Sequence, residues 1–261
     1  MQTIDRILQQ FAPISLSEME SVKLMNRIDT KFVMPLSQLP ELLRLAEQDY
    51  YVQEVGGKRT GDYDTTYYDT EDLDMYIRHH DRQLVRQKIR VREYVESRLF
   101  FLEVKRKNNK GRTKKKRIAL PSATLTPDTI GHGKVDVRVE DFIAAKSRYL
   151  YEQISPRLRT TFTRITLVNK SKTERLTIDT LLGFTNIRSG AEVRCPELVI
   201  VELKRDGNQP SPMLSITQQL RIHPLKISKY CIGTALTTPD VKQNRFKAKI
   251  RKIDKLVNGK S

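Results

Sequence analysis

Charged and apolar side chains alternate along the stretch from Leu84 to Leu120, and this pattern predicts β-strands. Lys88, Arg90 and Arg92 stand two residues apart, with apolar residues between them. Successive side chains of a strand point to opposite faces, so these three cations share one face. The next run repeats the pattern, with its charged positions at Glu103, Lys105 and Lys107. After a predicted turn over residues 108–111, a strongly basic strand returns to Leu120.

Three more predicted strands carry charge on one face only. They are residues 25–34 with Arg27, Asp29 and Lys31, residues 175–180 with Arg175, Thr177 and Asp179, and residues 197–205 with Glu202 and Lys204. Residues 50–55, 64–69 and 159–169 are predicted as further strands, which makes about eight long strands, mostly in sequence-adjacent pairs.

Apolar residues at three- and four-residue spacing predict helices between the strands. These helices cover residues 3–11, 37–48, 71–80, 139–153, 212–221 and 228–236. A short helix is also expected from Ser17, with Glu20 completing a capping box. The helix over 37–48 has Leu39, Leu42, Leu43 and Ala46 as its expected buried stripe. Residues 121–134 are predicted as a loop.

Sequence-adjacent strands favour an antiparallel meander. If all the charged faces point the same way, the sheet can close with the charges inside, and an eight-stranded barrel is just wide enough to hold one ligand. The predicted fold is therefore α+β: an antiparallel eight-stranded β-barrel with a polar tunnel and helices packed outside.

The segment after the last core helix has a different composition. Residues 242–261 carry eight Lys or Arg and one Asp, and Phe246, Ile250, Ile253 and Val257 have helical spacing. This pattern predicts a basic amphipathic helix. The expected division is a barrel domain over residues 1–236 and a basic tail over 237–261 that is dispensable for folding. Three interpretations of the tail stay open: packing on its own domain, binding to an acidic membrane and binding RNA.

Net charge limits the class of partner. The 261 residues include 48 Lys and Arg against 31 Asp and Glu, so the net charge is +17. This balance favours nucleotides, polyphosphate, nucleic acid or acidic membrane as partners. Cys195 and Cys231 lack metal-site spacing and indicate a reduced, cytoplasmic setting. The sequence lacks the apolar stretch of a signal peptide or a membrane span, so we expect a soluble protein, or one bound peripherally to a membrane through the tail.

Seven segments, taken together and in order, resemble a known family. They are NRIDTKFV at 26–33, YYDTEDLDMY at 67–76, KIRVREY at 88–94, FLEVKRK at 101–107, IDT at 178–180, IVELK at 200–204 and KISKY at 226–230. The set is similar to the VTC (vacuolar transporter chaperone) domain, which is the polyphosphate polymerase branch of the CYTH-like triphosphate tunnel metalloenzymes. The resemblance covers the chain up to residue 236.

The resemblance implies an antiparallel tunnel, lined with Arg and Lys, that holds a triphosphate or polyphosphate chain. The implied phosphate-binding residues are Lys31, Arg90, Arg92, Lys105, Lys116, Arg164, Arg175, Lys226, Ser228 and Lys229. Among them, Lys31, Arg90, Arg92, Lys105 and Lys229 are expected to be catalytic, and Lys116 is one choice among several lysines of its strand. Glu202 matches the metal-binding glutamate, and Asp179 is a second candidate ligand for Mn²⁺ or Mg²⁺.

The first charged strand departs from the wider superfamily. The superfamily has an ExExK motif there, and the same positions read Arg27, Asp29 and Lys31 in this chain. VTC-like members commonly replace these glutamates, so the departure favours a polymerase over the adenylate cyclase and thiamine-triphosphatase branches. It also leaves fewer carboxylates for a metal.

The functional hypothesis is metal-dependent transfer of the terminal phosphate of a nucleoside triphosphate, such as ATP, to a polyphosphate chain. One alternative is hydrolysis of tripolyphosphate or of a nucleoside triphosphate in the same tunnel, since only the acceptor differs. The alternative from another class is a non-catalytic protein that binds polyanions or nucleic acid. Aromatic residues make up only 7% of the chain and Trp is absent, which disfavours specific nucleic-acid recognition. We find no Ser/His/Asp triad, and His79 and His80 are interpreted as a pair on a helix surface.

Overall fold

The computed structural model describes residues 2–20, 27–121, 137–207 and 209–258, which form one 11-stranded sheet with helices around it. The strands are β1 (Ala12–Ile14), β2 (Arg27–Pro35), β3 (Tyr50–Gln53), β4 (Gly61–Asp69), β5 (Arg86–Tyr94), β6 (Leu99–Lys107), β7 (Thr113–Leu120), β8 (Ser155–Asn169), β9 (Glu174–Asn186), β10 (Glu192–Cys195) and β11 (Leu198–Asp206). Eight of them lie in one continuous order, β2–β11–β9–β8–β4–β5–β6–β7, and β1, β3 and β10 branch from it. The sequence pattern did not predict β1 and β10.

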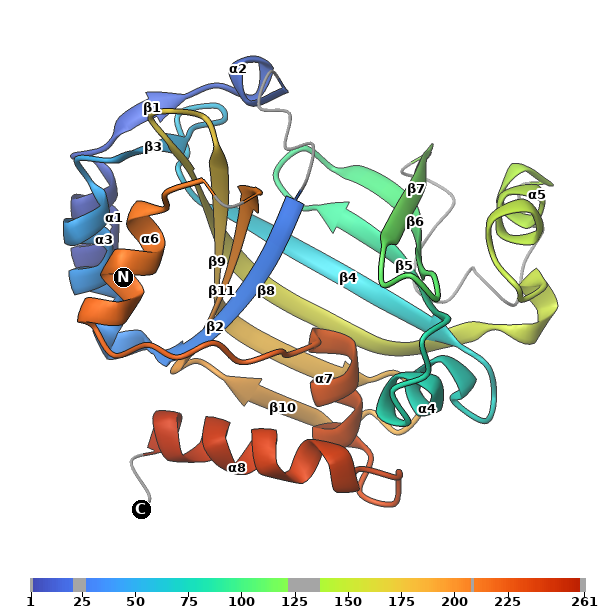
Figure 1. The fold of residues 1–261 in the computed structure, drawn as a ribbon. Helices are drawn as coiled ribbons and strands as arrows, with labels where there is room; N and C mark the ends of the chain where they lie inside the picture. The colour runs from blue at the N-terminus through green and yellow to red at the C-terminus, as the bar shows by residue number, and fades with distance from the viewer. Residues whose placement is uncertain (1, 21–26, 122–136, 208, 259–261) are drawn as a thin grey trace.

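Every pairing along this order is antiparallel, and the sheet curls into a half-barrel (Figure 1). The predicted α+β fold, with eight antiparallel strands curled around their charged faces, is confirmed. β2 and β7 are the two ends of the order, and within the described residues they do not pair with each other. The sheet therefore stays open along one side and does not close into a complete barrel.

Helices cover the convex side of the sheet in two places. The helices are α1 (Gln2–Leu8), α2 (Leu16–Glu20), η1 (Leu36–Gln38), α3 (Leu39–Ala46), α4 (Asp74–His80), α5 (Val137–Lys146), η2 (Tyr151–Gln153), α6 (Pro212–Gln219), α7 (Lys229–Thr237) and α8 (Asn244–Asn258). α1, α3 and α6 pack together against one half of the sheet, and the four apolar residues predicted for α3 are all buried there. α5 covers the apolar face of β5 and β6.

α7 lies on the concave side and covers one end of the half-barrel. A Cβ atom added to Gly233 would lie 2.5 Å from Cδ1 of Phe184 and 2.7 Å from Cδ2 of Leu158. The register of β8 with β9 places both of these side chains on the concave face. α7 therefore rests directly on the inner face of the sheet, at a distance that only glycine allows.

A β-bulge in β9 divides the concave face into a polar and an apolar part. The register of β9 with β8 shifts between Thr161 and Thr163, and Leu181 has a φ of 51°. A bulge inserts one extra residue and so changes which side chains face inward. Asp179 faces the concave side before the bulge, and Phe184 faces it afterwards in the buried cluster beneath α7.

α8 packs its apolar side onto the same end of the molecule. Phe246 and Ile253 are buried, and the Phe246 ring meets the Tyr76 ring edge-on. The described cations of α8 that lie in exposed positions are Arg245, Lys247, Arg251, Lys252 and Lys255. The predicted amphipathic helix is present and packs on its own domain. The division between residues 236 and 237 stays a prediction. Among the described residues, no helix is long and apolar enough to span a membrane.

The prediction that His79 and His80 form a surface pair was wrong for His80. The His80 ring is 2% exposed, and its Nδ1 lies 2.7 Å from Oδ1 of Asp81. Its Nε2 accepts a hydrogen bond from the backbone N–H of Arg245 at 3.2 Å. The imidazole thus fixes the first turn of α8 to the end of α4.

Two helix ends also differ from expectation. The capping box lies two residues earlier than predicted, because Ser15 Oγ accepts from the Glu18 N–H while Glu18 accepts from the Ser15 N–H at 2.9 Å. The helix predicted over 139–153 stops at Lys146, where the Ser147 hydroxyl accepts from the Tyr149 N–H and donates to the Tyr149 carbonyl. Of the loop predicted over 121–134, all but Pro121 lies outside the described residues.

Candidate functional site

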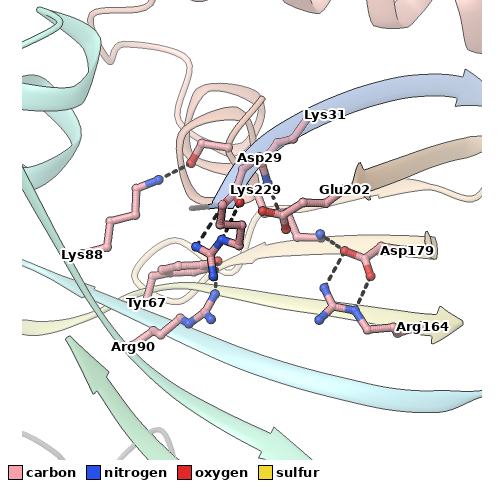
Figure 2. A network of polar contacts seen from close by, with 11 residues as sticks. Asp29, Lys31, Tyr67, Lys88, Arg90, Arg164, Asp179, Glu202 and Lys229 are labelled. Carbon is pink, nitrogen blue, oxygen red and sulfur yellow. Dashed lines mark hydrogen bonds and ion pairs between the residues drawn. The ribbon is translucent and has the colours of Figure 1, made fainter. Parts of the chain in front are cut away.

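Side chains from eight strands meet on the concave face. Residues directly opposite each other in adjacent strands share a face. Following the register across the sheet gives the pairs Lys31–Glu202, Lys204–Arg175, Asp179–Arg164, Tyr67–Arg90, Lys88–Lys105 and Glu103–Arg117. Figure 2 shows how the inner part of this set converges around Lys229, which enters from α7.

Asp179 is the centre of the first cluster. Arg164 donates two hydrogen bonds to it, from Nε at 2.6 Å and from a terminal nitrogen at 2.8 Å. Lys229 forms an ion pair with the Oδ2 atom of the same carboxylate. Burial alone would raise the pKa of Asp179, but Arg164 and Lys229 hold that pKa well below its usual range. Both oxygens are therefore occupied by cations.

Glu103 is the centre of a second cluster, on the other side of the half-barrel. Its side chain is fully buried, and its two oxygens accept from Arg90 Nε at 2.7 Å and from Lys115 Nζ at 2.6 Å. Burial opposes ionisation, but Arg90 and Arg92 hold the pKa of Glu103 well below its usual range. Arg90 also donates to the Tyr67 hydroxyl at 3.3 Å. Each of these two carboxylates thus orients two cations.

The N-terminus of α7 points into the same space. Ser228 caps the helix by accepting from the Cys231 N–H at 3.3 Å, and its Oγ accepts from Lys88 Nζ at 2.7 Å. A helix N-terminus carries a partial positive charge, which adds to the side-chain cations. Lys229 is the first residue of the helix and lies 4.5 Å from the centre of the Phe162 ring. The start of α7 therefore supplies a hydroxyl, an ammonium group and a dipole to the site.

Glu202 is less closely engaged than the other two carboxylates. Its Oε2 lies 3.4 Å from Lys31 Nζ, and its side chain is 20% exposed. Burial would raise the pKa of Glu202, but the neighbouring cations Lys31 and Lys204 hold it well below its usual range. The carboxylate is therefore ionised, and it retains lone pairs that no cation of the described residues occupies at short distance.

The concave face holds more positive than negative charge. Burial, followed by repulsion from Arg175, lowers the pKa of Lys204 to about 8. Arg90 and then burial lower the pKa of Lys105 well below its usual range. Burial and then Arg90 lower the pKa of Arg92 to about 10. Burial and neighbouring cations both disfavour the charged form of these side chains, so the shifts indicate a crowded cationic face that a bound anion would stabilise.

The structure brings together most, but not all, of the residues expected at the site. Those on the concave strands are Lys31, Arg90, Arg92, Lys105, Arg164 and Arg175, and those from the start of α7 are Ser228 and Lys229. Lys226 is exposed at the margin, where its backbone carbonyl accepts from Lys249 Nζ at 2.7 Å. It does not join either carboxylate cluster.

The choice of Lys116 was wrong. The register of β6 with β7 places Lys116 opposite Val104, on the convex face, whereas Lys115 lies opposite Lys105 and bonds to Glu103. Three lysines follow one another in this strand, so only the register of the hairpin decides which one faces inward.

The geometry also does not support Asp179 as a second metal ligand. Arg164 and Lys229 occupy its two oxygens. Its position instead makes it a residue that holds two cations in place.

Five charged residues of the site were not among those expected. They are Lys88, Glu103, Lys115, Arg117 and Lys204. The alternation of the strands already placed Lys88 on the face of Arg90, and Lys204 on the face of Glu202. Strict use of that alternation would have found these two. Nothing in the sequence showed that Glu103 would pair with both Arg90 and Lys115.

A divalent metal fits this face if substrate phosphates supply most of its ligands. In the part of the chain that the structure describes, no group of three His, Cys, Asp or Glu side chains could hold a metal by itself. Mg²⁺ is commonly held by one or two carboxylates together with substrate phosphates and water. Glu202, with oxygen lone pairs to spare, fits this mode of binding.

The curled antiparallel sheet with a cationic inner face defines the architecture of this protein. The chain belongs to the VTC domain family, whose profile matches residues 26–238.

Several solved structures are similar to this chain at low identity. A proposed adenylate cyclase from Bacillus halodurans is 14% identical, with 78% of this chain and 96% of that chain covered and a TM-score of 0.47. A proposed adenylate cyclase from Vibrio parahaemolyticus is 10% identical, with coverages of 80% and 99% and a TM-score of 0.47. A proposed adenylyl cyclase from Hippeastrum, described with a dominant triphosphatase activity, is 12% identical, with coverages of 81% and 96% and a TM-score of 0.45. A search of curated proteins found no match.

Proposed function

We propose that this protein is a phosphotransferase that moves the terminal phosphate of a nucleoside triphosphate onto a polyphosphate chain. The observation that carries the proposal is the excess of cations on the concave face, where Arg90 and burial lower the pKa of Lys105, and burial and Arg175 lower the pKa of Lys204. Membership of the VTC family supports phosphate-chain chemistry on such a face.

Phosphoryl transfer needs the terminal phosphate aligned with its acceptor and its charge neutralised. Guanidinium groups bind phosphate oxygens through paired donors, and ammonium groups act as point charges. We assign contact with the reacting phosphate to Lys31, Arg90, Arg92, Lys105 and Lys229. We assign binding of the rest of the chain to Arg164, Arg175, Ser228 and, at the margin, Lys226. Asp179 and Glu103 position the cations that they bind.

The carboxylates favour synthesis over hydrolysis. Attack by water needs a base to take a proton, and an effective base has a pKa near the working pH. The pKa values of Asp179, Glu103 and Glu202 are all held well below their usual range by cations. The end of a polyphosphate chain is already anionic and needs no base. The site therefore suits a phosphate acceptor better than water.

A divalent metal would bind at Glu202 together with the substrate phosphates. When bound, it would neutralise charge on the transferred phosphate. The side chains around it bind and orient the polyanion by themselves.

The test is product analysis after incubation with ATP labelled on its terminal phosphate, polyphosphate and Mn²⁺. Label in lengthened polyphosphate is expected, and Lys229→Met should abolish it. Lys170→Met is the matched control, because Lys170 is an exposed lysine in the turn after β8. Label in orthophosphate alone would make the protein a triphosphatase. If ATP is not consumed, competition between tripolyphosphate and tRNA would identify which anion a non-catalytic protein binds.

A further inference from the structure

The hairpin of β6 and β7 carries a dense band of positive charge that extends beyond the concave face. Nine cations and no Asp or Glu occur between residues 104 and 120. β7 is the last strand of the sheet and is seen at its edge in Figure 1. The inner face of the hairpin carries Lys105, Lys115 and Arg117, which belong to the site already described.

The other cations of the hairpin lie outside that site. Arg106 stands opposite Lys114, and Lys116 stands opposite Val104, so all three face the convex side. Lys110 and Arg112 lie in the turn, which is closed by a hydrogen bond from the Arg112 N–H to Asn108 at 2.9 Å. We call these five residues the outer band: Arg106, Lys110, Arg112, Lys114 and Lys116. All five are exposed, and none forms an ion pair with another described residue.

Protection of an exposed strand edge explains some of this charge, because lysines on an edge strand discourage pairing with other chains. It does not explain why the outer band continues the cationic lining of the concave face. Lys114, Lys115 and Lys116 are consecutive in β7 and project alternately outward and inward. The charge therefore runs without a break from the site, around the open edge of the sheet, to the convex side.

We propose that the outer band is a second binding site, outside the concave face, for the part of a linear polyphosphate chain that extends beyond the catalytic cluster. This inference rests on the proposed function, because the same chain would occupy both surfaces. The site takes long chains, whereas we expect tripolyphosphate to bind in the cluster around Asp179 alone, because β7 lies five strands away from β9 in the order of the sheet.

The chemistry of the outer band favours polyphosphate over other polyanions. Single-stranded nucleic acid binds where aromatic rings accompany the cations. The described residues 104–117 contain no aromatic residue. Adsorption to a membrane surface is strengthened by apolar side chains next to the cations. Val104, the apolar residue in this stretch, is buried.

The test compares the affinities of long-chain polyphosphate and tripolyphosphate for Lys114→Glu/Lys116→Glu and wild type. Reversal to Glu keeps the strand edge charged, so protection against aggregation is retained. The matched control is Lys170→Glu/Lys172→Glu, which reverses two exposed lysines in the turn between β8 and β9 and changes the net charge equally. We expect the outer-band variant to bind long chains about ten-fold more weakly, with unchanged affinity for tripolyphosphate, while the control binds both as wild type does.

Three outcomes would overturn the proposal. Equal losses in both variants would mean that net charge alone matters. Wild-type affinity of the outer-band variant for long chains would remove the second site. If wild type binds tRNA more tightly than long polyphosphate, and the outer-band variant loses that tRNA binding, the outer band is a nucleic-acid surface. If wild type does not bind tripolyphosphate but still binds long chains through the outer band, the proposed function is wrong and the proposal of a polyphosphate site on the outer band is retained.

Discussion

We expect Lys204 to couple the binding of a polyanion to the uptake of a proton. Its pKa is lowered to about 8 by burial and by neighbouring cations, so much of it is neutral above that pH. A phosphate chain would raise this pKa, because a nearby anion stabilises the ammonium form. Binding should therefore take up protons above pH 8 and weaken as the pH rises from 8 to 10. Calorimetry in buffers of different ionisation enthalpy measures this uptake.

The matched variant is Lys204→Arg, since an arginine at this position stays charged throughout that range. It should bind with less proton uptake and with a flatter pH dependence. Proton uptake identical to wild type would assign the effect to another group, with Lys105 the first to test.

Glu202 is the carboxylate expected to meet the metal. Glu202→Gln keeps the shape of the side chain but removes the charge that a divalent ion needs. Metal assistance contributes several kcal/mol to charge stabilisation, so turnover should fall by more than about a hundred-fold. Binding of tripolyphosphate without metal should be retained or tightened, because one negative charge has left the site. Initial rates over a Mn²⁺ titration and metal-free binding isotherms separate the two effects.

Asp29→Asn is the control for this experiment. Asp29 lies on β2 and is, like Glu202, a carboxylate on the charged face. Arg27 Nε contacts it at 2.5 Å, and its side chain is more exposed than that of Glu202. Near wild-type Mn²⁺ dependence is expected. Full activity of Glu202→Gln would show that a different group carries the metal.

At the level of elements, α7 is the part whose position the site depends on most. It brings in Ser228 and Lys229, and it can approach the sheet only because residue 233 is glycine. Gly233→Ala places a methyl group against Phe184 and Leu158, and such overpacking typically costs about 1–3 kcal/mol. We expect a lower melting temperature together with weaker tripolyphosphate binding, as Lys229 moves away from Asp179.

Gly61→Ala is the matched control, because the added Cβ would make only ordinary contacts of 3.7 Å or more. Phe184→Leu in the Gly233→Ala background should restore part of the affinity by making room. If Gly233→Ala lowers stability and leaves affinity unchanged, the helix adjusts without moving Lys229.

The sequence predicted the strands well where alternation continued without interruption. The charged faces of β2, β5, β6 and β11 follow directly from two-residue spacing. In β9 the predicted strand ended at Thr180, whereas the real strand continues to Asn186. The bulge at Leu181 breaks the alternation there, so the second half no longer had the pattern of the first.

Contacts between elements far apart in the sequence were the second feature that the sequence did not predict. The choice between Lys115 and Lys116 depends on how the hairpin pairs, which no property of the three consecutive lysines reveals. The burial of His80 depends on α8, which lies 165 residues later in the chain. Arg164 and Lys229 contact Asp179 only when β8, β9 and α7 are assembled. The sequence does not show that assembly, so it left Asp179 as a candidate metal ligand.

At the level of the whole molecule, α8 has two roles: its apolar side packs against the domain, and its other side presents exposed positive charge. Deletion of residues 242–261 should destabilise the protein, contrary to the expectation from sequence, because Phe246 and Ile253 belong to the buried cluster beneath α7. Loss of a buried Phe side chain alone costs about 3–5 kcal/mol. Chemical denaturation of the truncated and complete proteins measures the difference.

The charge of α8 is tested separately with Lys247→Gln/Arg251→Gln/Lys255→Gln, which leaves the apolar side intact. Polyphosphate affinity should fall at low salt and approach wild type at high salt, since salt screens exposed charges. If affinity is unchanged at low salt, the exposed face has a partner outside this chain. Binding to vesicles of acidic lipid would then test peripheral attachment to a membrane.

The bulge in β9 gives this strand a tolerance to the loss of one residue that a regularly alternating strand does not have. One extra residue at Leu181 lets a single strand present Arg175 and Asp179 to the ligand and Phe184 to α7, all on the same side. Deleting that one residue would restore regular alternation and still leave Phe184 on the concave face, because every later residue of β9 moves back by one position. In a regularly alternating strand, by contrast, the loss of one residue turns the rest of the strand to the opposite face.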